Sequence, residues 1–269
     1  MLRSDLIKNQ KASRGRTQGF LLNFLVNFSQ QARLIHAMIP FLKGKDDLFQ
    51  TAMRSYLIGM AACLETFYSD LYICVLDEDP KLLRSSLGQI KEKASLEEIH
   101  QLTVDGISFA ELSASKAAFQ NIEEIDRFLS TLFSQSGYLE TLSGYDFVCA
   151  VPSRNTKQAH MKLHAAWRGD FARIFQLRHE FAHDANSKTP LDTVELQRLE
   201  ACALLIPQMT AALIASNRSL KIVKSGTLPV LLIVDDLISD DWEVVEDESV
   251  EGGLSHGILD KGSESASQS

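Results

Sequence analysis

The chain has 269 residues, of which 45% are hydrophobic and 23% are charged, and its formal net charge is −8. This composition is ordinary for one large or two small globular domains and excludes fibrous and wholly disordered proteins. The acidic charge is concentrated late in the chain: residues 235–269 hold eleven acids against one base, and removing that −10 from −8 leaves about +2 for residues 1–234. A near-neutral body neither requires nor excludes a nucleic-acid partner.

Residues 1–18 carry five basic side chains but no short apolar core with a small-residue cleavage site, so we expect a flexible basic arm rather than a secretory signal. The four cysteines are far apart and form no Cys-x-x-Cys pair, which favours buried thiols in a reducing compartment over disulfides or a zinc site. We therefore expect a cytoplasmic protein without a metal or cofactor. The most apolar segment, residues 56–76, contains Glu65 and Asp70, which argues against a membrane span and a membrane partner.

The first half of the chain shows the apolar spacing of helices. Residues 20–42 repeat apolar groups at steps of three and four, with Pro40 near the end of the run. The longest predicted helix begins at Asp46 and ends at the Asp-Glu-Asp-Pro stretch, because Pro80 cannot continue its hydrogen bonding. Its apolar stripe consists of Phe49, Met53, Tyr56, Leu57, Met60, Leu64, Phe67, Leu71 and Val75.

Shorter helical pieces follow over residues 81–120, and Asn121 is then the predicted cap of a helix with Glu124 at its third position. Residues 137–155 are expected to form a looser connection. Asp170 is the predicted cap of the next helix, and Thr189-Pro190 precedes a last helix from Leu191 to about Ser216.

Beyond residue 220 only Leu228–Ile233 has the composition of a strand, and no partner strand is evident for it. The acidic tail lacks the composition of a packed core, so we expect it to be disordered, serving either as a solubilising tail or as a mimic of phosphate charge that shields a basic site. The predicted fold is all-α. A helical bundle spans residues 19–220, between the basic arm (1–18) and the strand-like piece with the acidic tail (221–269).

The chemistry-bearing residues gather on the helix expected after Asp170. Its apolar face consists of Phe171, Ile174, Phe175, Phe181 and Ala182, and helical spacing places Arg178 within that same stripe. An unpaired guanidinium against apolar neighbours costs several kcal/mol, so Arg178 must meet an acid, a subunit partner or a phosphate. Glu65 is one candidate acid; in that case the pair could serve helix packing alone.

His179 and His183 lie four residues apart and share one edge of this helix with Glu180. A histidine can take the proton from a ribose 2′-hydroxyl or give one to the departing 5′-oxygen, and an arginine can stabilise the charge on the phosphate. The nucleophile already belongs to the substrate, so this reaction needs no metal. The cluster is therefore chemically suited to RNA cleavage.

These residues resemble the HEPN superfamily, whose ribonuclease members carry Arg-x4-6-His with a polar residue directly after the arginine; Arg178, His179 and His183 match that motif. Residues 61–71 resemble the acidic helix of the branch typified by RiboL-PSP-HEPN and MAE-type HEPN proteins, and residues 119–129 resemble its middle helix. The resemblance covers roughly residues 45–215. Nucleotide-transferase-linked members often have a tyrosine two residues after the histidine, where this chain has Ala185.

The resemblance implies a HEPN-like helical bundle that forms a homodimer, in which arginine and histidine from two copies build one cleft that cuts RNA without metal. The expected catalytic residues are Arg178 and His183, with His179 and Glu65 in support. Family members often act as toxins or in anti-phage defence, so an antitoxin or another neutralising partner is a further expectation.

His179-Glu180-Phe181-Ala182-His183 also spells the zinc-binding motif His-Glu-x-x-His of metalloproteases. The glycine and third histidine of the metzincin continuation are absent, and Glu195 or Glu200 could supply a third ligand instead. A third possibility is a non-catalytic helical module that binds RNA or protein. His160 and His164 lie among basic residues and are expected to be solvated, within a surface that could contact RNA.

Overall fold

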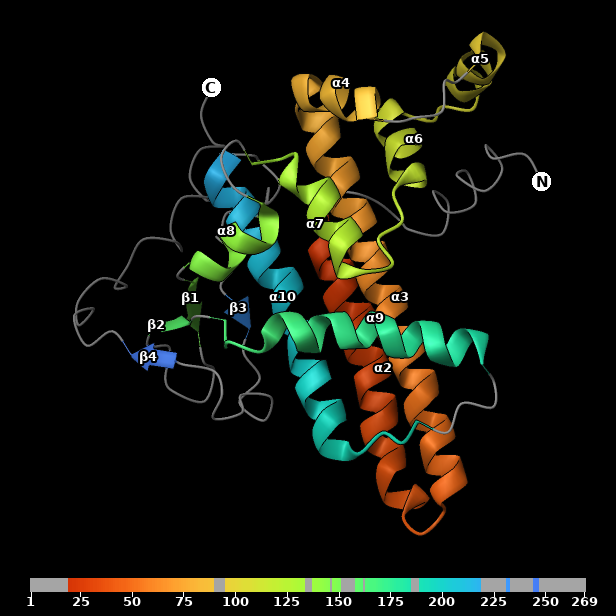
Figure 1. Cartoon of the computed structure of the whole chain (residues 1–269), viewed down its shortest axis with the longest axis vertical. Helices are drawn as coiled ribbons and strands as arrows, with labels where there is room; N and C mark the ends of the chain where they lie inside the picture. The colour runs from red at the N-terminus through yellow and green to blue at the C-terminus, as the bar shows by residue number, and fades with distance from the viewer. Residues whose placement is uncertain are drawn as a thin grey trace, which may run out of the picture.

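Two long apolar helices, α3 (Asp46–Glu78) and α10 (Thr193–Arg218), form the centre of the computed structural model (Figure 1). The structure describes residues 19–89, 95–133, 137–145, 147–150, 158–161, 163–184, 189–218, 231–232 and 244–246. The other helices are α2 (Phe20–Leu42), α4 (Pro80–Gln89), α5 (Leu96–Val104), α6 (Phe109–Lys116), α7 (Ile122–Ser130), α8 (Tyr138–Gly144) and α9 (Trp167–His183). The predicted, mostly helical character is confirmed.

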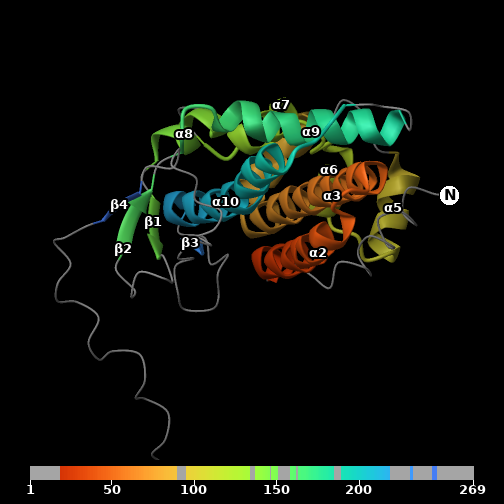
Figure 2. The same cartoon turned by 90° about the horizontal axis from the view of Figure 1, so that it is seen from below.

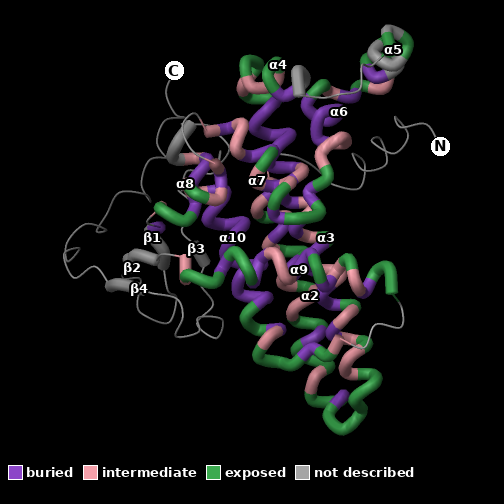
Figure 3. Tube along the Cα trace, in the orientation of Figure 1, coloured by how far each residue is buried: buried purple, intermediate pink, exposed green. Residues whose placement is uncertain are grey.

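The central helix α3 follows its predicted bounds. Every residue of the predicted stripe is buried except Phe49, which packs at the edge of the core. Residues 70–76 are all buried, so this end of α3 is surrounded on every side (Figure 3). The helix ends at Glu78 as predicted, and the side chain of Asp79 then accepts hydrogen bonds from the backbone N–H groups of Lys81 and Leu82, which caps α4 at Pro80.

The helices stack in layers around α3 and α10. Seen along the bundle, α2 lies on one side of this pair, and α9 and α7 lie on the other (Figure 2). Aromatic rings of Phe20 and Phe24 on α2 pack against Phe67 of α3, and the ring of Phe171 on α9 packs against Tyr68. Residues from all three layers therefore contribute to one hydrophobic core.

A side-chain cap sets the start of α7, whereas α9 begins without one. Asn121 accepts a hydrogen bond from the backbone N–H of Glu124, which confirms the predicted start of α7. The prediction for α9 is wrong by one turn: the helix begins at Trp167 rather than after Asp170, because the buried indole of Trp167 packs into the core and extends the helix. Asp170 instead lies in the first turn.

A small sheet flanks the helices, in the order β3-β1-β2-β4, and the sequence did not predict it. The four strands are β1 (Phe147–Ala150), β2 (Gln158–Met161), β3 (Leu231–Leu232) and β4 (Val244–Glu246). The expectation that the Leu228–Ile233 segment has no partner is wrong for residues 231–232, which pair in parallel with β1. Residues 244–246 of the predicted disordered tail pair antiparallel with β2.

The strands have only two to four residues each, too few to display an alternating pattern, and their partners are distant in sequence. The residues expected to form a looser connection, 137–155, contain α8 and β1. The basic arm, residues 1–18, and most of residues 219–269 lie outside the described residues.

By length and apolar composition, α3 and α10 could each cross a membrane. In both helices, however, the larger share of the most apolar segment is buried inside the bundle, as in core helices.

Candidate functional site

Helix α9 carries the predicted site and crosses α3 at a steep angle (Figure 1). Phe171, Ile174, Phe175 and Phe181 are buried as predicted, whereas Ala182, at the end of the helix, is exposed. The buried face fixes the rotation of α9 about its axis, which determines where its polar side chains point.

Arg178 faces α3 and meets the predicted acid. Its Nη2 atom lies 3.3 Å from Oε1 of Glu65, and the two side chains are 24% and 23% exposed. That oxygen has no hydrogen-bond partner among the described residues, so the contact is an ion pair without a well-directed hydrogen bond. Burial raises the pKa of Glu65, and the nearby guanidinium of Arg178 only partly offsets this.

The two histidines of the motif lie on the solvent side of α9. His179 and His183 are both exposed, and their ring centroids are 4.5 Å apart with an angle of 54° between the rings. They occupy the last two turns of α9. Two exposed imidazole rings are therefore within reach of a solute.

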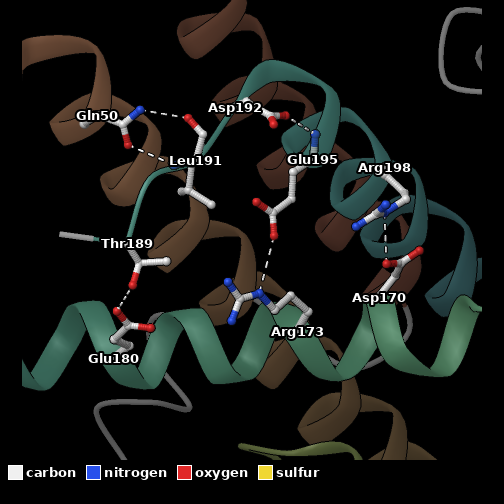
Figure 4. A network of polar contacts seen from close by, with 9 residues as sticks. All are labelled: Gln50, Asp170, Arg173, Glu180, Thr189, Leu191, Asp192, Glu195 and Arg198. Carbon is white, nitrogen blue, oxygen red and sulfur yellow. Dashed lines mark hydrogen bonds and ion pairs between the residues drawn. The ribbon is translucent and has the colours of Figure 1, made fainter. Parts of the chain in front are cut away.

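Glu180, between the histidines, is occupied by a different contact. Its carboxylate accepts a hydrogen bond from the hydroxyl of Thr189, in the segment that leads into α10 (Figure 4). That segment is also fastened to α3, because the Gln50 side chain donates to the carbonyl of Leu191 at 2.8 Å and accepts from its N–H at 3.0 Å. The end of α9 is thus held in place without the use of either histidine.

The structure separates the predicted catalytic residues within one chain. Arg178 makes no hydrogen bond or ion pair with His179 or His183 in the part of the chain that is described. The separation follows from helical geometry, since five residues turn the helix by roughly 140° beyond one full revolution. A site that uses both Arg178 and His183 therefore needs a substrate that spans the helix, or a second copy of the chain.

Among the described residues, the two carboxylates predicted as a third ligand of the alternative zinc site have other partners. Glu195 is paired with Arg173 at 3.3 Å (Figure 4). Glu200 is buried and accepts a hydrogen bond from the hydroxyl of Tyr56 at 2.7 Å. Its second oxygen is hydrogen-bonded to Nε2 of His36 at 3.0 Å. Both candidate carboxylates are thus engaged away from His179 and His183.

No protein-family model, curated protein or solved structure matches this chain. The HEPN resemblance stays a prediction that rests on the residues quoted above.

One cluster of side chains was not predicted from the sequence. His164, expected to be solvated, has a side chain only 7% exposed and faces Asp170 and Cys202. The three side chains come from a loop and two helices, so their spacing in sequence gives no motif. The one sequence feature that could have pointed to this cluster is Asp170. This acid lies four residues before the buried Ile174 and therefore on the predicted apolar face of the helix.

Proposed function

We propose that this protein is a metal-independent endoribonuclease that acts as a homodimer, with Arg178 and His183 as catalytic residues. One observation carries the proposal: two exposed imidazoles lie 4.5 Å apart on the same helix as a half-buried arginine. Solvent-exposed imidazoles and a fixed cation are groups that can catalyse phosphodiester cleavage.

The reaction needs one proton acceptor and one proton donor. His183 accepts the proton of a ribose 2′-hydroxyl as the 2′-oxygen attacks phosphorus. The bond from phosphorus to the 5′-oxygen breaks, and an imidazolium gives that oxygen its proton. The products are a 2′,3′-cyclic phosphate and a 5′-hydroxyl. The spacing of the rings suits His179 to serve as the second proton carrier or to orient His183.

Arg178 supplies the charge that stabilises the transition state. In the free protein its partner is Glu65, at 3.3 Å and without a well-directed hydrogen bond, so a phosphate can compete for the guanidinium. A phosphate that approaches α9 can therefore take over Arg178. Because Arg178 and His183 point to different sides of α9, we place Arg178 of one copy beside His183 of the second copy in the cleft.

The test is cleavage of labelled RNA by the full chain in the presence of EDTA. We expect cleavage to persist, with 2′,3′-cyclic phosphate ends, and His183→Ala to reduce the rate by at least about 100-fold. His100→Ala, which removes an exposed histidine on α5, is the matched control and should keep full activity. We also expect growth arrest on expression in the cytoplasm to depend on His183, as for a toxin or defence effector.

Two outcomes would end the proposal. One is cleavage that EDTA removes, that added zinc restores and that His179→Ala abolishes. This outcome would support the zinc-site hypothesis. The other is a His183→Ala variant that binds and cleaves RNA as the unchanged chain does, which would leave a non-catalytic module.

A further inference from the structure

Three side chains of metal-binding type meet at the N-terminal end of α9. His164 lies in the connection from β2 to α9, Asp170 lies in the first turn of α9, and Cys202 lies in α10. Their ligand atoms all lie within 4.8 Å of one another, with His164 Nε2 3.8 Å from Asp170 Oδ2 and 3.9 Å from Cys202 Sγ. Among the described residues, no other group of three such side chains is this close.

The cluster is buried and contains an unexplained polar atom. Cys202 is fully buried, and the side chains of His164 and Asp170 are 7% and 10% exposed. Asp170 Oδ1 accepts from Nε of Arg198 at 2.9 Å (Figure 4), whereas its Oδ2 has no hydrogen-bond partner among the described residues. A buried carboxylate oxygen without a partner costs about 1–3 kcal/mol or more, so such an oxygen indicates a missing ligand.

We propose that His164, Asp170 and Cys202 bind one divalent transition-metal ion, with zinc as the best match. Zinc takes nitrogen at about 2.0–2.1 Å, oxygen at about 2.0–2.2 Å and sulfur at about 2.3 Å, so neighbouring ligand atoms of a tetrahedral site lie roughly 3.4–3.6 Å apart. The separations of 3.8 and 3.9 Å are slightly wider, and small side-chain movements close them around an ion. A mixed nitrogen, oxygen and thiolate set favours zinc over magnesium or calcium.

The surrounding groups support such a site. Arg198 holds one oxygen of Asp170 and leaves the other directed at His164, as an outer partner that orients a ligand does. Burial and the negative charge of Asp170 raise the pKa of Cys202, so without an ion the thiol keeps its proton. An ion displaces that proton and takes the thiolate.

The site would link three parts of the fold. An ion bound there joins the connection that follows β2, the first turn of α9 and the middle of α10. Asp170 and His183 are thirteen positions apart on α9, which places the two about 20 Å apart along the helix axis. The ion is therefore too far from His183 in the same chain to take part in the proposed cleavage, and the two proposals stand or fall separately.

The experiment uses the full chain after chelation and titrates it with Co²⁺ alone. We expect one equivalent to produce a near-ultraviolet thiolate-to-cobalt absorption band with the visible bands of a four-coordinate ion. Added Zn²⁺ should then bleach these bands and raise the midpoint of thermal unfolding.

Matched variants assign the ligands. Cys202→Ser should lose the thiolate band, and Cys63→Ser, which alters a half-buried thiol on α3, should keep it. The double variant with His179→Ala and His183→Ala should also keep the band, because neither ring belongs to the proposed site. A cobalt ion bound by those two rings would have no thiolate ligand and would give no such band.

The proposal is overturned if the unchanged protein shows no thiolate band at one equivalent of Co²⁺, whatever the variants do. It is also overturned if the band persists in Cys202→Ser. Cleavage of RNA is not a readout here, so an inactive protein that gives the band still supports the metal site.

Discussion

At the C-terminal end of α9, His179 and His183 lie exposed to solvent with ring centroids 4.5 Å apart. At the N-terminal end, the side chain of His164 is 7% exposed and faces a buried carboxylate and a buried thiol. The same residue type is thus placed in opposite surroundings near the two ends of α9. Exposed rings can reach a substrate, whereas enclosed polar groups must be compensated by one another or by an ion.

A row of polar contacts between the two ends keeps α9 on α10. Asp170 pairs with Arg198, and Arg173 pairs with Glu195 (Figure 4). These two ion pairs fix the position of α9 on α10 without involving His179 or His183. Under the two proposals, the C-terminal end of α9 takes part in the reaction and the N-terminal end contributes stability, and experiments can test each.

The largest expected effect distinguishes two arginines on α9. Arg178→Ala should reduce RNA cleavage by at least about 100-fold, because it removes the charge that stabilises the phosphate in the transition state. Arg173→Ala removes an arginine with a similar ion pair, to Glu195, and should leave the rate per folded molecule unchanged. Single-turnover rates with saturating RNA measure the difference.

Equal losses in both variants would contradict the special role of Arg178. Thermal unfolding of the two variants serves as the check on folding, and similar midpoints are expected because both pairs are partly exposed.

The next effect concerns stability and compares two acids on α9. Asp170→Asn should lower the free energy of unfolding by about 1.5–3 kcal/mol in EDTA, because it removes a charge-assisted hydrogen bond to Arg198 and an acid from the first helical turn. Glu180→Gln, whose partner is a hydroxyl, should cost about 0.5–1.5 kcal/mol. Urea unfolding checks both, and a larger loss for Glu180→Gln would reverse the assignment of the two ends.

The helices were predictable because their signals are local. The bounds of α2 and α3 follow from apolar spacing, and the start of α7 follows from the Asn121 cap. The pairing of Arg178 with Glu65 was also predictable, since a guanidinium on an apolar stripe needs an acid on the facing helix.

The sheet and the buried cluster depend on contacts between distant segments. Residues 231–232 meet residues 149–150 only in the folded chain, and His164 reaches Cys202 across 38 positions of sequence. No periodicity within a window of a dozen residues encodes such contacts. The exposure of His179 and His183 likewise depends on what covers α9, which helical spacing alone does not state.

The smallest expected effect tests the ion pair that fastens Arg178. Burial raises the pKa of Glu65, so the folded chain holds the proton of this carboxyl more tightly than the unfolded chain does. The resulting stability is fully present below the ordinary pKa of glutamate, about 4.3, and is lost as the pH rises through the raised value.

Glu65→Gln mimics the protonated carboxyl and should not show this loss of stability. Relative to the unchanged chain, the variant should therefore become more stable as the pH rises from about 4 to 7, by no more than about 1 kcal/mol for a partly exposed pair. Urea unfolding across that range measures the difference, with Glu124→Gln, in the exposed pair with Arg127, as the control. The opposite slope would mean that attraction to Arg178 outweighs burial, and Arg178 would then be held too firmly by Glu65 to be surrendered to a phosphate.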